Sequence, residues 1–165
     1  MTDQTISVRL LAAGDAAAEA GLGGVRDRFM IDGADTDERF ALVQHLFAPM
    51  ALAAPKHRHR NEDEYTYVLT GLIGEVIEGQ EVLASPGDLL FKPRGQWHTF
   101  WNAGAEPAVC LELISPAGLE NLFRSFATLT EPPTPEELAG MAAEYGCDID
   151  FEGTFPLVER LGLVF

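Results

Sequence analysis

Two stretches of the chain decide its fold, because their polar residues stand at fixed spacings. Residues 57–71 are HRHRNEDEYTYVLTG and residues 87–102 are GDLLFKPRGQWHTFWN. Three of the four histidines of the chain lie in them: His57, His59 and His98. Side chains on a strand alternate between its two faces, so the two histidines of the first stretch point the same way. The pattern predicts two imidazoles on one side of a β-strand and a third on a later strand.

A carboxylate completes this polar set. Glu64 follows His59 at an odd spacing, which unbroken alternation would place on the opposite face, so we expect a kink or short loop within residues 60–63. Three imidazoles and one carboxylate suit one divalent transition metal (Fe, Mn, Ni, Zn or Cu), and they leave an octahedral ion about two open positions. From spacing alone, a short basic patch over residues 56–60 is the alternative, although acidic residues follow it at once.

The two stretches also resemble the two motifs of the cupin superfamily. The matching residues are His57, His59, Glu64 and Gly71 in the first motif and Gly87, Pro93, Gly95, His98 and Asn102 in the second. One position departs, since Ala51 stands where the family has a leading glycine. The resemblance implies an all-β fold, a double-stranded β-helix or jelly-roll barrel, which holds a metal through the three histidines and Glu64. We expect these ligands on one sheet, facing the other sheet across a cavity.

The composition limits the class of protein. The chain has 165 residues and a formal net charge of −15. This length predicts one domain with room for an appendage. The acidic surface is expected to repel nucleic acid and anionic membranes, so neither is an expected partner. We see no basic leader and no apolar run of membrane length, and expect a cytoplasmic protein. Cys110 and Cys147 do not make a disulfide framework, and Cys110 is expected to be a buried thiol.

Alternating and β-branched residues predict the remaining strands. They are expected over residues 25–31, 39–47, 65–70, 73–77, 81–84, 89–92 and 108–115. Nearer the N-terminus, residues 6–11 are compatible with an edge strand and residues 14–20 with a short helix. The barrel and its N-terminal strand segment are therefore expected to occupy residues 1–116.

After residue 116 the apolar period changes from two to three or four, which indicates helices. The first helix is expected around Leu119, Leu122, Phe123 and Phe126. A capping box at residues 134–137 predicts a second helix that stops at Gly146, and residues 156–161 are expected to form a third. Residues 117–165 are thus expected to be a helical extension, packed on the barrel or on a partner subunit. Exposed sheet edges and the apolar tail favour a homodimer.

Several polar residues remain open in this interpretation. His45 is expected to be hydrogen-bonded rather than metal-bound. Either Leu42, Gln44 and Leu46 or Val43, His45 and Phe47 face the cavity, because the register cannot be read from sequence. Glu112 points either inward, beside the metal, or outward. Arg26 and Arg28 share one face of an early strand, and an inward placement would favour an anionic substrate.

The resemblance also implies a function. The chain is similar to small single-domain cupins of the quercetin-dioxygenase-like kind. This likeness implies a metal-dependent, dioxygenase-like oxidoreductase that acts on a small chelating organic substrate. Glu64 is the candidate catalytic residue, because a carboxylate ligand can leave the metal and shuttle a proton. The alternatives are a metal-dependent isomerase or decarboxylase and a small-molecule-binding cupin without turnover.

Overall fold

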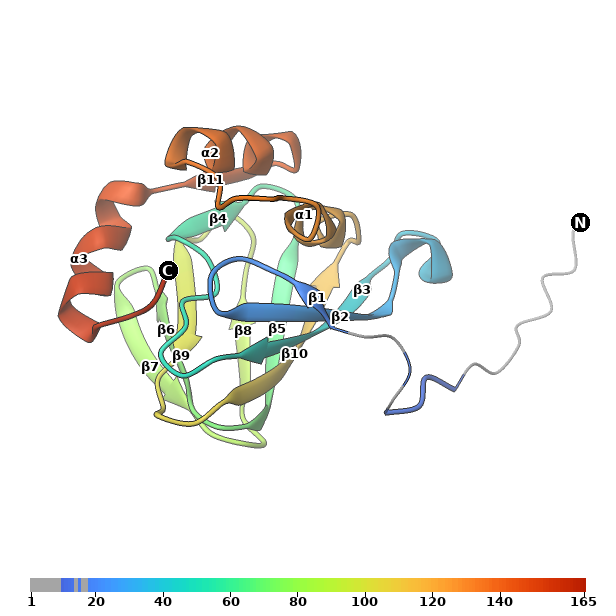
Figure 1. Ribbon diagram of the computed structural model, residues 1–165. Coiled ribbons are helices and arrows are strands. Elements are labelled where there is room, and N and C mark those ends of the chain that lie inside the picture. The colour runs from blue at the N-terminus through green and yellow to red at the C-terminus, as the bar shows by residue number, and fades with distance from the viewer. Residues whose placement is uncertain (1–9, 14, 16–17) are drawn as a thin grey trace, which may run out of the picture.

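The structure is a computed structural model that describes residues 10–13, 15 and 18–165. Two antiparallel sheets face each other as a barrel, and the C-terminal segment lies over one end and one side of it (Figure 1). The expected jelly-roll barrel with a helical extension is confirmed. Residues 6–9 of the predicted edge strand lie outside the described residues, as do residues 14, 16 and 17 of the predicted helix.

The first sheet has six strands. Their order is β1 (Glu19–Ala20), β2 (Val25–Ile31), β3 (Ala41–Phe47), β10 (Ala108–Ser115), β5 (Asp63–Thr70) and β8 (Leu89–Lys92). Burial alternates along β3 and β10, as expected for strands with one face on a core. The second sheet has five strands, in the order β11 (Cys147–Ile149), β4 (His57–His59), β9 (His98–Asn102), β6 (Ile73–Ile77) and β7 (Gln80–Ala84).

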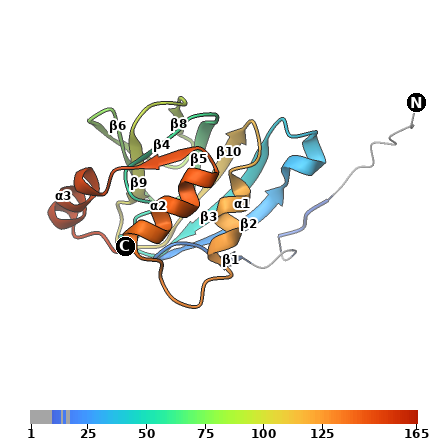
Figure 2. The same cartoon turned by 90° about the horizontal axis from the view of Figure 1, so that it is seen from above.

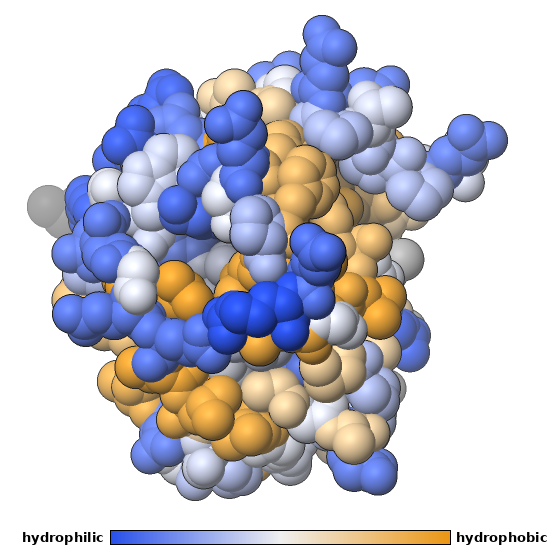
Figure 3. Space-filling view, turned by 90° about the vertical axis from the view of Figure 1, so that its left-hand side faces the viewer, coloured by the Kyte–Doolittle hydropathy of each residue, from blue (hydrophilic) through white to orange (hydrophobic). Residues whose placement is uncertain are grey.

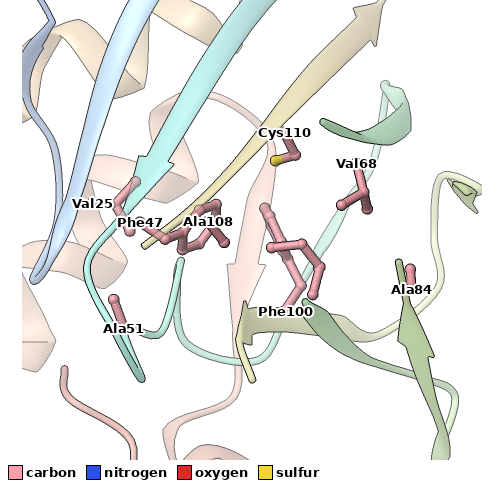
Figure 4. Close-up of a cluster of buried hydrophobic side chains, with 9 residues drawn as sticks. Val25, Phe47, Ala51, Val68, Ala84, Phe100, Ala108 and Cys110 are labelled. Atoms are coloured by element: carbon pink, nitrogen blue, oxygen red, sulfur yellow. The ribbon is translucent and has the colours of Figure 1, made fainter. Parts of the chain in front are cut away.

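Apolar side chains from both sheets meet inside the barrel (Figure 4). Phe47 of β3 and Phe100 of β9 pack edge to face with ring centroids 5.7 Å apart, which joins the two sheets. Val68 and Cys110 complete this cluster from β5 and β10. Cys110 is fully buried, as predicted.

The chain after the barrel forms three helices, which are α1 (Glu120–Phe126), α2 (Pro135–Glu144) and α3 (Phe151–Leu161). In α2 the predicted capping box is present, with Thr134 Oγ1 accepting from the amide of Glu137. Helices α1 and α2 lie across the barrel end (Figure 2). Leu122, Phe126 and Leu138 belong to the same buried cluster as Val43 of β3. The tail was expected to pack on the barrel or on a partner subunit, and in the structure it packs on its own barrel.

The tail differs from the prediction in two places. It contains a strand, β11, which extends the five-stranded sheet at β4, whereas helices alone were predicted. Three residues are too few for a period to be recognised. The third helix begins at Phe151 rather than Pro156, because Asp150 caps it through the amide of Gly153. Proline is favoured at the first helical position, but here Pro156 lies inside the helix. A domain boundary at residue 116 stays a prediction.

Nearer the N-terminus, residues 19–20 form a strand paired with β2 and not the end of a helix.

Helix α3 covers the five-stranded sheet, where its side chains pack around Leu52, Trp101 and Leu163. Hydrophobic and hydrophilic patches alternate on this side of the molecule (Figure 3). Of the helices in the described part of the chain, none is long and apolar enough to span a bilayer.

Candidate metal centre

The two sheets together bring the four predicted ligand residues into one cluster. His57 and His59 lie on β4 and His98 on β9, where it is the cross-strand partner of His57. Glu64 lies on β5, in the other sheet, so the expectation that all four share one sheet is wrong. Residues 60–62 carry the chain from β4 to β5 without strand structure, and the predicted break between His59 and Glu64 is thereby confirmed.

The cluster is compact and buried. One ligand atom from each of the four residues lies within 4.8 Å of the others, and the side chains are buried. The ring centroids of His57 and His98 are 4.3 Å apart, and those of His57 and His59 are 4.8 Å apart. Three imidazoles and a carboxylate this close together, away from water, are a donor set for a transition metal.

Hydrogen bonds behind the rings orient two of the three imidazoles. His57 Nδ1 donates to the carbonyl oxygen of Pro55 at 2.7 Å, and His98 Nδ1 donates to that of Gln96 at 3.0 Å. Each bond places the proton on Nδ1 and leaves Nε2 as a lone-pair donor. Both ring nitrogens of His59 are buried and make no hydrogen bond among the described residues, although Nε2 lies 3.3 Å from Glu64 Oε2. A buried unpartnered nitrogen at this point fits a metal ligand.

Glu64 is held by a lysine that the sequence analysis did not single out. Lys92 lies opposite Glu64 in the register of β5 and β8, and its Nζ is 3.2 Å from Glu64 Oε2. The same oxygen is 3.2 Å from His98 Nε2 and 3.3 Å from His59 Nε2. Burial alone would raise the pKa of Glu64, but Lys92 and His59 outweigh it and hold this pKa well below its usual range. The carboxylate is therefore ionised and available as a ligand.

Lys92 also pairs with a second buried carboxylate. Its Nζ is 2.9 Å from Glu112 Oε1, and Thr66 Oγ1 donates to Glu112 Oε2 at 2.7 Å. Glu112 therefore points inward, which settles one of the open alternatives.

Glu75 of β6 is fully buried with both carboxylate oxygens unpartnered among the described residues, and burial raises its pKa to about 7. The one sequence signal for this network is strand alternation, which places Lys92 on the same face of β8 as Leu90.

The glycines and the asparagine of the two motifs serve the backbone. Gly71 has φ +81°, and a Cβ there would lie 2.5 Å from that of Ala108. Gly95 has the same φ and donates its amide to the carbonyl oxygen of His59 at 2.7 Å, which ties the second motif to the histidine strand. Asn102 bonds three backbone groups with its side chain. These residues aim the strands and do not enter the site.

A small, partly open cavity of about 60 Å³ lies beside the cluster. Ligand residues His57, His59 and Glu64 line it together with Phe100 and apolar residues of the tail; the latter are Leu119, Leu122, Phe123, Phe126, Leu138, Ala142 and Ile149. Its lining residues include no lysine or arginine among the residues described. The cavity joins a candidate metal centre to an apolar wall.

The register of β3 places Val43, His45 and Phe47 inward, the second of the two sets left open. His45 lines the cavity, and its Nδ1 lies 2.6 Å from Oδ1 of Asp27, which is also a lining residue. The prediction of a hydrogen-bonded His45 is confirmed. Its partner was missed, because nothing in the sequence relates residues 18 positions apart on two strands. The exposed Arg26 and the half-buried Arg28 alternate with the buried Val25 and Asp27, so both arginines lie on the outer face of β2.

A larger groove lies outside the cavity. It has a volume of about 560 Å³, and Leu22, Phe126 and Leu138 belong to the walls of both spaces. The groove is mainly apolar, with Phe151, Phe155 and Phe165 among its lining residues. The side chains of α1 and α2 thus separate the candidate metal centre from an open, apolar surface.

Comparisons with known proteins agree with this architecture. Residues 44–114 match the family model of the cupin domain. The tetracenomycin polyketide synthase protein TcmJ of Streptomyces glaucescens is 25% identical over 114 residues, which are 69% of this chain and 76% of that protein. Among solved structures, the polyketide cyclase RemF from Streptomyces resistomycificus has a TM-score of 0.58 and 26% identity, over 66% of this chain and 80% of that one.

The fold match extends to more distant proteins. An RmlC-like cupin from Shewanella frigidimarina has a TM-score of 0.59 with 19% identity, over 70% of this chain and 96% of that one. At this identity the likeness concerns the fold alone. With its two facing sheets and its two motifs, and with residues 44–114 matching the family model, the barrel of this chain has the cupin fold.

Proposed function

We propose that this chain is a metal-dependent enzyme that cyclises a small polyketone, a molecule with several ketone groups along one carbon chain. One observation carries the proposal: three of the four ligand residues line the same mainly apolar cavity as a buried His45–Asp27 pair. Neighbouring ketone oxygens can chelate a divalent ion, and the carbon between them carries an acidic proton. The site therefore has a group for each of these two features.

Two similar proteins support this substrate class. The names of TcmJ and RemF both refer to polyketides, and RemF is named a cyclase. The absence of lysine and arginine from the described lining of the cavity argues against phosphorylated substrates. The outward Arg26 and Arg28 provide no anion site in the cavity either.

A divalent ion held by His57, His59, Glu64 and His98 would act as a Lewis acid on a ketone oxygen and make its carbon electrophilic. The apolar wall excludes water from the reacting groups and orients the carbon skeleton. Lys92 holds the Glu64 carboxylate ionised, and this favours a carboxylate that stays bound to the metal. The role of Glu64 as a proton shuttle stays a prediction.

The sizes of the two spaces suggest how the substrate is placed. A cavity of about 60 Å³ holds only a few atoms, whereas ligand sites are typically 300–1,000 Å³. The adjoining groove of about 560 Å³ is in that range. We infer that the reacting end enters the cavity past Phe126 and Leu138 while the rest of the molecule lies in the groove.

The proposal is tested by incubating metal-loaded protein with a synthetic triketone whose cyclisation gives an aromatic ring. We expect a cyclised product of the same mass or of that mass less one water, without oxygen uptake. Protein stripped of metal is the control and is expected to be inactive. Oxygen consumption with an oxygenated product would instead support the dioxygenase-like oxidoreductase. Metal-dependent binding without any product would support the binding protein without turnover.

We also propose that the protein is a homodimer. Part of the outer face of the six-stranded sheet is apolar, and a shallow hollow there is lined by Phe40, Leu42, Tyr65, Tyr67, Leu89, Leu111, Leu113 and Ser115. An antiparallel sheet with one solvated face usually carries polar residues there. A second copy of the same sheet is the simplest cover for such a surface.

A further inference from the structure

We propose that His45 is the catalytic base of this site, that Asp27 orients it, and that its target is an acidic C–H group next to a ketone. The assignment rests on the proposed function, because it names the proton-transfer group of the same cavity. The four ligand residues would offer their lone pairs to a bound metal, so a separate group of the cavity is available for this proton transfer. His45 and Asp27 come from β3 and β2, outside both motif stretches.

The hydrogen bond between the two residues decides which ring nitrogen is available. A carboxylate only accepts, so His45 Nδ1 donates to Asp27 Oδ1 across 2.6 Å. The neutral ring then carries its lone pair on Nε2. Nε2 has no hydrogen-bond partner among the residues that the structure describes. This is the arrangement in which a carboxylate fixes the tautomer and orientation of a catalytic imidazole.

The surroundings of the ring favour a role in the cavity over a purely structural pair. Both His45 and Asp27 are buried, yet both belong to the lining of the cavity that holds His57, His59 and Glu64. The rings of Phe47, Phe100 and Phe123 meet His45 edge to face and hold its plane. The imidazole is thus positioned by four side chains and still faces the space where a substrate would lie.

The electrostatic surroundings strengthen the base. Burial lowers the pKa of His45, but Asp27 outweighs it, and the pKa is raised above its usual value. The other charged groups that act on the ring are Glu112 of β10, which raises this pKa, and Lys92 of β8, which lowers it. A base of raised pKa takes a proton more readily from a weak carbon acid.

The proton balance of the step is simple. Nε2 takes a proton from the carbon next to the ketone, and the electrons of the C–H bond pass into the enolate. The enolate carbon then forms a bond to a second carbonyl carbon, and the oxygen of that carbonyl takes the proton back from Nε2. His45 ends the cycle neutral, and the product is a cyclic hydroxyketone with the atoms of the substrate.

The test uses 2-hydroxyacetophenone, which chelates metals through its phenol and ketone oxygens and has exchangeable methyl protons. With zinc-loaded protein in D₂O, NMR follows the loss of the methyl signal, and a separate titration measures binding of the probe. We expect wild-type protein to accelerate the exchange, and His45→Gln to reduce it by roughly 100-fold or more with unchanged binding. Asp27→Asn is expected to reduce exchange as well, while Gln44→Ala, on the outer face of β3, keeps it.

The outcomes separate the two proposals. Equal exchange by wild-type protein and His45→Gln, both binding the probe, would overturn the assignment of His45 and leave the proposed function standing. Failure of wild-type protein to bind the probe in a metal-dependent way would overturn both. If His45→Gln does not fold, as judged by circular dichroism and zinc content, Asp27→Asn decides. The exchange rate of wild-type protein must also fall as the pH drops through the raised pKa of His45, and a flat profile would contradict the base.

Discussion

The inner wall of the barrel carries charged side chains among its apolar ones, whereas the outer face of the six-stranded sheet exposes large apolar side chains. The inner wall holds the side chains of Lys92, Glu64 and Glu112 away from water. The outer face exposes apolar side chains, with Leu89 at 59% and Tyr67 at 43% of their full exposure. An ordinary sheet with one solvated face has the opposite pattern. Burying charged side chains costs free energy, so their presence in the inner wall points to a functional site. The exposed apolar side chains of the outer face point to a surface that another molecule covers.

The largest effect is expected from breaking the inner charge network. Lys92→Met leaves Glu112 and Glu64 without a counter-charge, and we expect a loss of roughly 3–5 kcal/mol in the free energy of unfolding, measured with urea. The double variant Lys92→Met/Glu112→Gln removes one uncompensated charge and should recover part of this loss. Wild-type stability in Lys92→Met would show that the inner charges are not coupled.

The metal cluster is the second target on the inner wall. His59→Ala and His98→Ala each remove a ligand, and we expect metal affinity to fall by at least about 100-fold, since loss of an outer partner alone costs 10–100-fold. Elemental analysis of protein purified without added metal measures the effect. Gln44→Ala, on the outer face of β3, is the matched control. Wild-type metal content in both histidine variants would contradict the site.

Glu75 tests the inner wall through pH. Its folded-state pKa near 7 lies above the 4.5 of an ordinary glutamate, because burial disfavours the charged form. The charged groups that act on it are Lys92, Glu112 and Glu64. The stability from its protonated form is therefore complete below pH 4.5 and is lost as the pH rises through about 7.

The matched variant for this prediction is Glu75→Gln, which keeps the shape and removes the charge. We expect it to be more stable than wild-type protein by about 1–3 kcal/mol above pH 7, and nearly equal to it near pH 4.5. Urea unfolding of both proteins across this range measures the difference. Parallel curves at every pH would mean that Glu75 does not titrate in the folded protein.

The smallest effect is expected on the outer face. Leu111→Glu places a charge in the centre of the apolar hollow on the six-stranded sheet, and we expect dimer affinity to fall by at least about tenfold. Light scattering at micromolar concentration measures the mass. The inner wall should be untouched, so metal content is expected to stay at the wild-type level. A single-chain mass for wild-type protein would rule out the homodimer.

The sequence alone determined the local features of this protein. Motif spacing identified the four residues of the cluster, alternation placed the main strands of the barrel, and the capping box located α2 within one or two residues. These features depend on residues that are near in sequence, where periodicity, turn chemistry and capping act. The break between His59 and Glu64 belongs with them, since it follows from an odd spacing on a strand.

Tertiary structure decided everything that depends on pairing between distant segments. It placed Glu64 in a different sheet from the three histidines, turned His45 inward toward Asp27, and set Lys92 opposite Glu64. It also added β11 to the edge strand β4, whose unpaired backbone groups give a three-residue segment a partner. A shift of one residue in register would reverse every inward and outward side chain, and only packing of the whole barrel selects among registers.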